Sequence, residues 1–185
     1  MNSTASPRPL VVLGVSGSIA AYKAADLASQ LVKEGCEVRV VLTTAAERFV
    51  TPLTLQTLSR NEVVRASDAS HSDWKPLHIE LADRASLLLV APATANLIAE
   101  LALGLAGHPL AEIALATRAP ILIAPAMNGH MWDHPATQKN VQTLRERGVH
   151  FVGPCEGLLA CGYEGNGRLA ELQEILAVVR RTLSS

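Results

Sequence analysis

Apolar positions along the chain form short continuous runs that alternate with stretches of helical periodicity. The run from Leu10 to Val15 is uninterrupted and rich in β-branched residues, which is typical of a strand buried on both faces. In residues 20–34, Ala24, Leu27 and Leu31 recur at helical spacing, and Gly35 lies where a glycine ends a helix. The same order continues along the chain: we expect strands at 38–42, 86–90, 120–124 and 149–152, helices at 51–59, 96–105, 110–117, 135–147 and 169–182, and a glycine-rich loop at 154–168.

This alternation predicts an α/β fold: a Rossmann-like or flavodoxin-like, doubly wound parallel sheet with helices on both faces. A length of 185 residues fits a single domain, and we expect residues 1–8 to be a disordered tail and residues 9–185 to form the domain. Ligands of such folds bind at the carboxyl ends of the strands. We therefore expect ligand-binding residues in the segments that follow Val15, Leu42, Val90, Ala124 and Val152.

Composition narrows the class of protein. Hydrophobic residues make up 49% of the chain and charged residues 18%, which excludes a disordered protein. A net charge of −1 provides no basic surface for nucleic acid. The N-terminus has no apolar segment behind a basic end, and polar residues interrupt the apolar stretch 87–107, so we expect neither a signal peptide nor a membrane span. These features predict a cytoplasmic protein with no nucleic-acid or membrane partner.

Cysteine and aromatic content restrict the chemistry further. The chain has three cysteines and no C-x-x-C pair, so neither a disulfide framework nor a zinc knuckle is indicated. His71, Asp73 and His78 lack a fourth metal ligand, and we expect no metal. Aromatic residues make up 3% of the chain, so a flat ligand would find few rings to stack on.

The segment 14–20, which follows the first strand, is rich in Gly and Ser. Ser16, Gly17 and Ser18 would let backbone amides and hydroxyls approach an anion at the start of a helix. The segment lacks the glycines of the dinucleotide fingerprint and the lysine of a Walker A loop. It also has Ser18 where a nucleophile elbow requires glycine. It is therefore either a mononucleotide-type phosphate loop or a tight strand–helix turn.

Two further segments follow strands. Pro92 is expected to end the strand 86–90, and Thr94 and Asn96 either cap the next helix or reach a ligand. After the strand 120–124, Asn128 can donate to a carboxylate within a dry wall formed by Met127, Met131 and Trp132.

His78 and Cys161 are candidate reactive side chains. A lone histidine such as His78 is more often a capping or surface residue than an acid–base group. Cys161 lies in a glycine-rich segment close to Arg168, where a thiol is accessible and a nearby cation favours the thiolate. Neither residue points to one reaction by itself.

Together these segments resemble the homo-oligomeric flavin-containing cysteine decarboxylases. The resemblance runs from Val11 to Glu171 and rests on four segments in the same order: 14–23 (GVSGSIAAYK), 78–81 (HIEL), 91–96 (APATAN) and 125–132 (PAMNGHMW). The segment 159–168 around Cys161 resembles the substrate clamp of members that act on phosphopantothenoylcysteine. Many members carry Ala-Asp-Asp/Asn-Leu-Leu-Thr where this chain has 106–111 (AGHPLA), a departure expected to alter flavin affinity, redox poise or oligomer geometry.

The resemblance implies an FMN-binding domain in a homotrimer, or in a dodecamer of four trimers, with the flavin between subunits. His78 would then meet flavin that is bound largely by a neighbouring chain. The implied substrate-binding residues are Asn128, Met131, Ala160 and Arg168. The implied cofactor-binding residues are Ser16, Gly17, Ser18, Thr43, Phe49, Thr94, Ala95, Asn96, Ala126 and Met127.

The resemblance also implies an oxidative decarboxylation. A cysteine carboxylate is lost readily once the CH₂–S unit is oxidised to a thioaldehyde, because the C=S group then accepts the electrons, and FMN is the hydride acceptor. His78 would act as base or proton relay, Asn128 would hold the carboxylate, and Cys161 would supply a proton if the ene-thiol is reduced.

The substrate that fits best is 4′-phosphopantothenoylcysteine, whose decarboxylation gives 4′-phosphopantetheine in coenzyme A biosynthesis. One alternative is a decarboxylase of the C-terminal cysteine of a precursor peptide, which forms an aminoenethiol. Others are a flavin-binding regulatory subunit, against which His78 and Asn128 argue, and a flavin prenyltransferase, which has no use for the Asn128 and Cys161 segments.

Overall fold

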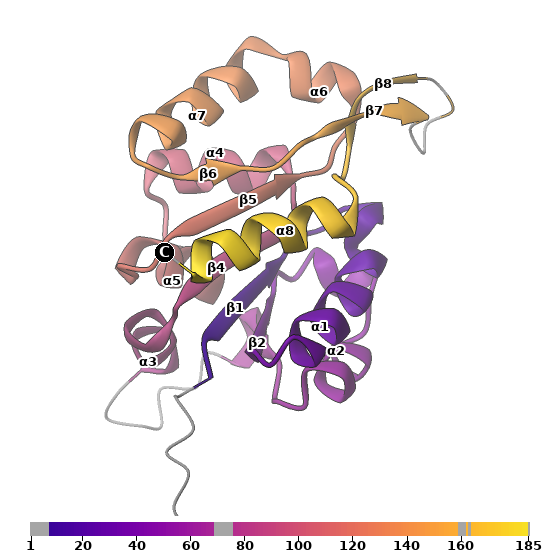
Figure 1. The fold of residues 1–185 in the computed structure, drawn as a ribbon. Helices are drawn as coiled ribbons and strands as arrows, with labels where there is room; N and C mark the ends of the chain where they lie inside the picture. The colour runs from indigo at the N-terminus through magenta and orange to yellow at the C-terminus, as the bar shows by residue number, and fades with distance from the viewer. Residues whose placement is uncertain (1–7, 69–75, 159–161, 163, 185) are drawn as a thin grey trace, which may run out of the picture.

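Six parallel strands form the central sheet of the computed structural model, which describes residues 8–68, 76–158, 162 and 164–184. The strand order is β3-β2-β1-β4-β5-β6, the order of a doubly wound dinucleotide-binding fold (Figure 1). The predicted fold class is therefore confirmed. The strands are β1 (Leu10–Val15), β2 (Glu37–Leu42), β3 (Val64–Arg65), β4 (Leu87–Ala93), β5 (Ile121–Pro125) and β6 (His150–Phe151).

Helices cover both faces of this sheet (Figure 1). One face packs against α1 (Lys23–Lys33), α2 (Pro52–Ser59) and α8 (Leu172–Leu183). The other packs against α3 (Leu77–Arg84), α4 (Ala95–Leu103), α5 (Pro109–Ala116) and α7 (Pro135–Glu146). Shorter helical segments are η1 (Ile19–Tyr22), η2 (Ala46–Arg48), η3 (Ala66–Asp68) and α6 (Gly129–Asp133).

Alternate side chains of the strands enter two separate hydrophobic cores. In β1, Val11, Leu13 and Val15 lie in the core under α1 and α8, while Leu10 and Val12 lie in the core under α4 and α5. Because both faces of β1 are covered, the strand is apolar at every position, as its continuous run of hydrophobic residues predicts.

Helix α5 approaches the sheet closely at Gly14. A Cβ at this position would overlap the end of the Leu110 side chain in α5, so a larger residue here would displace that side chain. This contact fixes the depth of α5 relative to the carboxyl end of β1.

Strand β4 continues past Pro92 to Ala93, which corrects the prediction that Pro92 ends the strand. The pairing of β4 with β5 shifts register between Val90 and Ala93. An irregularity of this kind accommodates a residue that has no N–H to donate to the sheet. The strand therefore carries Ala93 and Thr94 further towards the site than the sequence indicates.

Part of the predicted loop 154–168 is an antiparallel hairpin of β7 (Cys155–Leu158) and β8 (Glu164–Arg168). The hairpin lies beyond the edge of the main sheet (Figure 1). Most of its side chains are exposed or half-buried, so its strands lack the apolar alternation that would have revealed them. The two-residue strand β3 and the short helix α6 were also missed by the sequence analysis.

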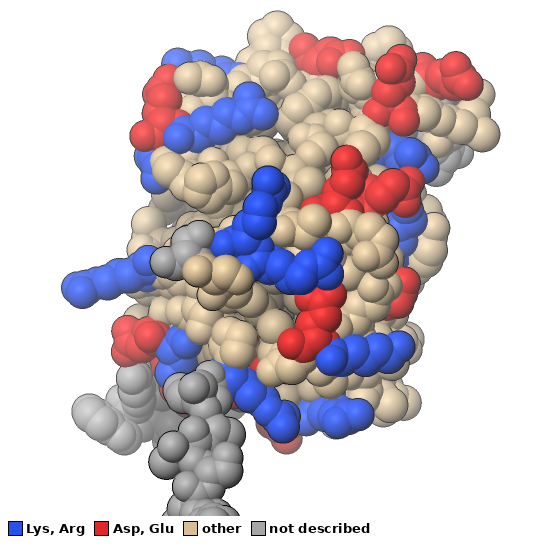
Figure 2. All heavy atoms as spheres, viewed as in Figure 1, with Lys and Arg blue, Asp and Glu red and all other residues tan. Residues whose placement is uncertain are grey.

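Polar contacts fasten α8 to α1 on the face that Figure 2 presents, where basic and acidic side chains are interspersed. Arg180 pairs with Glu34 at 2.7 Å, and Gln173 donates to Gln30 at 3.1 Å. Within the described ranges, no helix combines the length and apolar character needed to cross a membrane. The tail predicted at residues 1–8 lies outside the described residues, apart from Arg8.

Candidate functional site

A cavity of about 590 Å³ opens at the carboxyl ends of β1, β4 and β5, below the β7–β8 hairpin. This is the edge of the sheet at which a doubly wound fold binds its ligands. The wall brings together many residues that the sequence assigned to cofactor or substrate: Gly17, Ser18, Thr94, Ala126, Met127, Asn128, Met131 and Arg168.

Ser16 joins the ends of β1 and β4 and is 2% exposed. Its hydroxyl donates to the carbonyl of Pro92 at 2.8 Å and accepts the amide of Thr94 at 2.9 Å. Its own amide also donates to the Pro92 carbonyl. Ser16 therefore holds the two loops against each other from beneath and is not among the residues that line the cavity.

Gly17 and Ser18 line the cavity immediately before η1. A Cβ at Gly17 would overlap Ala45, so this close approach of two loops requires glycine. The hydroxyl of Ser18 accepts the amide of Ala20 at 3.3 Å, which caps η1. A hydroxyl that accepts one bond keeps its hydrogen for a second, so Ser18 can still donate to a ligand.

Thr94 and Asn128 have the same dual arrangement at the ends of the next two strands. The hydroxyl of Thr94 accepts the amide of Leu97 at 3.3 Å and caps α4. The Oδ1 atom of Asn128 accepts the amide of His130 at 2.9 Å and caps α6. Capping through oxygen sets the orientation of both side chains, and the donors are the Thr94 O–H and the Asn128 NH₂ group.

The hairpin is fastened to the Asn128 turn through Gly167. The amide of Met127 donates to the Gly167 carbonyl at 2.9 Å. Any Cβ at Gly167 would collide with the Met127 carbonyl oxygen. This contact holds Arg168 and Leu158 of the hairpin at the cavity wall.

Two cationic side chains line the cavity. The Arg168 guanidinium pairs with Glu171 at 2.9 Å, where both side chains are largely exposed. Lys23 comes from the first turn of α1. An anionic group in the cavity would therefore meet positive charge from α1 and from the hairpin.

The site predictions missed several wall residues: Ile19, Ala20, Tyr22, Lys23, Leu158, Gly167 and Leu169. Tyr22 and Lys23 belong to the 14–23 segment, so their adjacency to the Ser16–Ser18 turn was the available signal. Leu158 and Leu169 reach the cavity through the hairpin, whose existence the pattern did not reveal.

Besides Ser16, four further predicted cofactor residues and His78 do not line this cavity. Thr43 accepts the amide of Ala46 at 3.3 Å, and Phe49 is 44% exposed after η2. Ala95 and Asn96 form the first turn of α4, and Asn96 donates to Glu100 at 2.9 Å instead of capping the helix. Ala160 and Cys161 lie outside the described residues.

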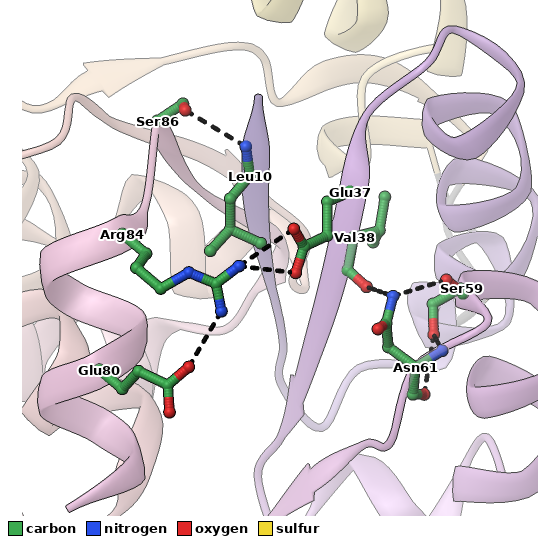
Figure 3. A network of polar contacts seen from close by, with 8 residues as sticks. All are labelled: Leu10, Glu37, Val38, Ser59, Asn61, Glu80, Arg84 and Ser86. Carbon is green, nitrogen blue, oxygen red and sulfur yellow. Dashed lines mark hydrogen bonds and ion pairs between the residues drawn. The ribbon is translucent and has the colours of Figure 1, made fainter. Parts of the chain in front are cut away.

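His78 is on α3 and pairs with a carboxylate of α5. Its Nδ1 atom lies 3.2 Å from Oε2 of Glu112. Helix α3 is tied to β2 by Arg84, which donates to Glu80 at 2.9 Å and to both carboxylate oxygens of Glu37 at 3.1 Å (Figure 3). These bonds, first that with Glu80, raise the pKa of the Arg84 guanidinium further above its ordinary value.

The 106–111 departure includes a histidine that caps α5. The Nδ1 atom of His108 accepts the amide of Ala111 at 3.4 Å, and Nε2 lies 3.0 Å from Oε2 of Glu100. Since Nδ1 accepts, the ring hydrogen is on Nε2 and is donated to Glu100. An imidazole thus performs the capping that Asp or Asn would perform at the start of α5.

The two described cysteines, Cys36 and Cys155, are free thiols. Burial raises the pKa of the Cys36 thiol, and burial followed by the charge of Glu174 raises that of Cys155. Both therefore stay protonated at neutral pH and are poor nucleophiles. In the described part of the chain, no cluster of three His, Cys, Asp or Glu side chains is arranged to hold a metal ion.

The chain matches the family described as Flavoprotein over residues 1–184. It is 49% identical to the coenzyme A biosynthesis bifunctional protein CoaBC of Bacillus subtilis, over 92% of this chain and 42% of that relative. This chain thus spans less than half the length of the bifunctional relatives that it matches. It is 45% identical to a probable phosphopantothenoylcysteine decarboxylase of Streptococcus mutans, over 94% of this chain and 98% of the relative.

Solved structures agree with the sequence matches. A mutant PPC decarboxylase complexed with pantothenoylaminoethenethiol has a TM-score of 0.86 and 34% identity, covering 97% of this chain and 100% of that chain. The FMN-dependent cysteine decarboxylase SpaF has a TM-score of 0.82 and 31% identity, over 96% and 98% of the two chains. The protein therefore belongs to the flavoprotein family that contains the cysteine decarboxylases, and the resemblance found in its sequence is confirmed.

Proposed function

We propose that this protein is an FMN-dependent carboxy-lyase that decarboxylates the cysteine unit of 4′-phosphopantothenoylcysteine, a step of coenzyme A biosynthesis in the cytoplasm. The observation that carries the proposal is the wall of one cavity. The amide of Asn128 lies there with the hydroxyls of Ser18 and Thr94 and the cations of Lys23 and Arg168. The similarity to a probable phosphopantothenoylcysteine decarboxylase over nearly both full lengths supports this substrate.

The cavity fits FMN in size and in chemistry. Its volume of about 590 Å³ is within the range of roughly 300–1,000 Å³ that small-molecule and cofactor sites occupy. Gly17, Ser18 and Thr94 would hold the polar part of the cofactor through backbone and hydroxyl donors. Ala126 and Met127 would face its ring. Bound FMN supplies the hydride acceptor that protein side chains lack.

Asn128 would bind the substrate carboxylate through its NH₂ group. The apolar wall beside it, which includes Ala126, Met127 and Met131, excludes water from this carboxylate. Once the substrate carries a thioaldehyde, the Cα–carboxylate bond breaks, CO₂ leaves, and the electron pair moves to sulfur to give an ene-thiolate. Asn128 thus holds the carboxylate in place until the bond breaks.

His78 would take the thiol proton on Nε2 as the substrate is oxidised. Since His78 does not line the cavity of its own chain, we propose that it serves the cavity of a neighbouring subunit in a homotrimer, alone or within a dodecamer. Cys161, with Ala160 beside it, would donate a proton when the ene-thiol is reduced to the aminothiol. Arg168 would bind the phosphate of the substrate.

A peptide ending in cysteine is the second candidate substrate. Its support is the apolar rim of the cavity, where Tyr22 is 61% exposed and Leu158 is 68% exposed. Such a rim suits a hydrophobic side chain of a peptide better than it suits a phosphate. The two cations in the wall favour the phosphorylated substrate.

Flavin content and product mass test the proposal together. The purified protein should be yellow, or should become yellow with added FMN, and should convert 4′-phosphopantothenoylcysteine to a product lighter by one CO₂. A parallel incubation with a cysteine-terminated peptide distinguishes the substrates. A product that also lacks two hydrogens indicates that the ene-thiol is released unreduced. A colourless protein that binds no FMN would contradict the proposal.

A further inference from the structure

Glu112 is the described acidic side chain that contacts His78. The Nδ1 atom of the imidazole lies 3.2 Å from Glu112 Oε2, within ion-pair distance. Their side chains are 29% and 34% exposed, so the pair is partly covered by the protein and partly open to the surface. The proposed function gives His78 a role but gives none to Glu112.

The two helices that carry this pair are fixed relative to each other. Helix α3 packs directly against α5, and the hydroxyl of Thr117, just after α5, donates to the carbonyl of Ala82 in α3 at 2.9 Å. At the other end of α5, the amide of Glu112 donates to the His108 carbonyl at 3.0 Å, under the His108 cap. Glu112 therefore stands on a helix held at both ends, which fixes its backbone relative to α3.

The chemistry of the contact selects one form of the histidine. At 3.2 Å from Nδ1, the carboxylate oxygen of Glu112 favours the form of the ring with its hydrogen on Nδ1, because a lone pair there would face a negatively charged acceptor. The lone pair of the neutral ring then lies on Nε2, the atom that faces away from Glu112.

We infer that Glu112 is a positioning residue for His78: it holds the imidazole in the Nδ1–H form and turns Nε2 towards the thiol of the substrate. The inference rests on the proposed function for its catalytic consequence, while the tautomer follows from the contact alone. Glu112 touches neither substrate nor cofactor in this scheme and acts through His78.

Substitution of Glu112 tests the catalytic consequence. Glu112→Leu removes the acceptor and should lower kcat by about 10- to 100-fold, the scale on which outer carboxylates act on imidazoles in metal sites. KM should change little, because the substrate is bound by the cavity. Glu112→Gln keeps an acceptor without the charge and should fall between Glu112→Leu and the wild type. Glu34→Gln is the matched control, because Glu34 is a similarly exposed carboxylate, paired with Arg180 on α8.

Nitrogen NMR of the ¹⁵N-histidine-labelled protein tests the tautomer directly. His78 should carry its hydrogen on Nδ1 in the wild type and should lose that preference in Glu112→Leu. His108 provides an internal reference, because its contacts with Ala111 and Glu100 require the hydrogen on Nε2.

The outcomes separate the inference from the proposed function. An Nε2–H tautomer at His78, or an undiminished kcat in Glu112→Leu, would overturn the inference. A wild-type protein that decarboxylates neither cysteine substrate, yet has Nδ1–H at His78, would overturn the proposed function and leave the positioning contact in place.

Discussion

Ser18, Thr94 and Asn128 each perform a structural task and face the cavity at the same time. Each accepts a backbone amide through its side-chain oxygen, from Ala20, Leu97 and His130 respectively. This bond sets the orientation of each side chain, and the other polar group of each, an O–H in Ser18 and Thr94 and an NH₂ in Asn128, is a hydrogen-bond donor by its chemistry. The structural and ligand-binding roles that the sequence left as alternatives for Thr94 are therefore compatible in a single residue.

Asn128→Asp separates these two tasks. Aspartate still accepts the His130 amide, so α6 keeps its cap, but it loses the NH₂ donors and adds a negative charge beside the substrate carboxylate. The loss of a hydrogen bond to a charged group, about 1.5–3 kcal/mol, predicts a fall in kcat/KM of about 10- to 150-fold, with FMN still bound. The measurement is steady-state decarboxylation beside a flavin titration.

Gln56→Glu is the control for that change, since it makes the same conversion of amide to acid on the exposed side of α2. It should leave activity and flavin affinity unchanged. Full activity in Asn128→Asp would show that this amide does not hold the carboxylate.

Gly167→Ala tests the attachment of the hairpin to the site. The new methyl group would collide with the Met127 carbonyl, and the backbone there has a φ of 149°, which L residues rarely adopt. A strained backbone position of this kind costs about 1–3 kcal/mol. We expect lower thermal stability and weaker substrate binding, measured by thermal unfolding and by KM.

Gly107→Ala is the matched substitution, because the space around Gly107 is open and its φ is not in the left-handed region. It should leave stability and KM close to those of the wild type. Equal effects of the two substitutions would argue against a specific role for the Gly167 contact.

Among the helices, α5 combines a departure from the family pattern with the contact to His78. His108 caps its first turn, Leu110 packs on Gly14, and Glu112 meets His78. The stretch 106–111, whose departure from the family pattern was expected to alter flavin affinity, redox poise or oligomer geometry, thus supplies the cap of α5.

His108→Ala measures the contribution of this cap. Loss of an N-cap costs about 1 kcal/mol, which corresponds to a fall in Tm of about 2–4 °C for a domain of this size. His108→Asn, which restores a capping oxygen, should recover most of the loss. Differential scanning calorimetry at a fixed FMN concentration provides the comparison. If His108→Ala and His108→Asn were both as stable as the wild type, the cap would have no energetic role.

The elements that the sequence predicted well are those in contact with a core. Strands β1 and β2 and helix α7 carry apolar positions at the period of their structure, because each buries at least one face. Strands β7 and β8 were missed because most of their residues are exposed or half-buried, without apolar alternation. The extension of β4 was missed because a register shift, which leaves no mark in hydrophobicity, lets a proline remain in the strand.

The candidate site, like the fold, could be predicted only in part from the sequence. Segments after β1, β4 and β5 could be expected to meet, since parallel strands end at one edge of the sheet. The contribution of Tyr22 and Lys23 was suggested only by their place after the Ser16–Ser18 turn, because helical spacing alone does not say which side of η1 and α1 borders a cavity. Leu158 depends on the return of the hairpin, a tertiary contact made through Gly167 and Met127.

For the whole molecule, the separation of His78 from its own chain's cavity predicts shared sites between subunits. His78→Ala and Asn128→Ala should each be inactive alone. In mixed trimers made by co-expression of equal amounts, about one quarter of the sites should combine an intact His78 with an intact Asn128. Activity near that fraction, with the trimer verified by native mass spectrometry, is the expected result. No recovery in verified mixed trimers would place both residues in one chain's site.

The most direct test of the proposed function follows the carboxyl carbon itself. 4′-Phosphopantothenoylcysteine labelled with ¹³C in the cysteine carboxylate is incubated with the FMN-loaded protein, and the released gas and the remaining thiol are analysed by mass spectrometry. We predict that labelled CO₂ is released in an amount equal to that of 4′-phosphopantetheine. With Asn128→Asp, both products should form only in the small amounts that its reduced rate allows. Retention of the label in unchanged substrate by the yellow, FMN-loaded wild-type protein would contradict the assignment.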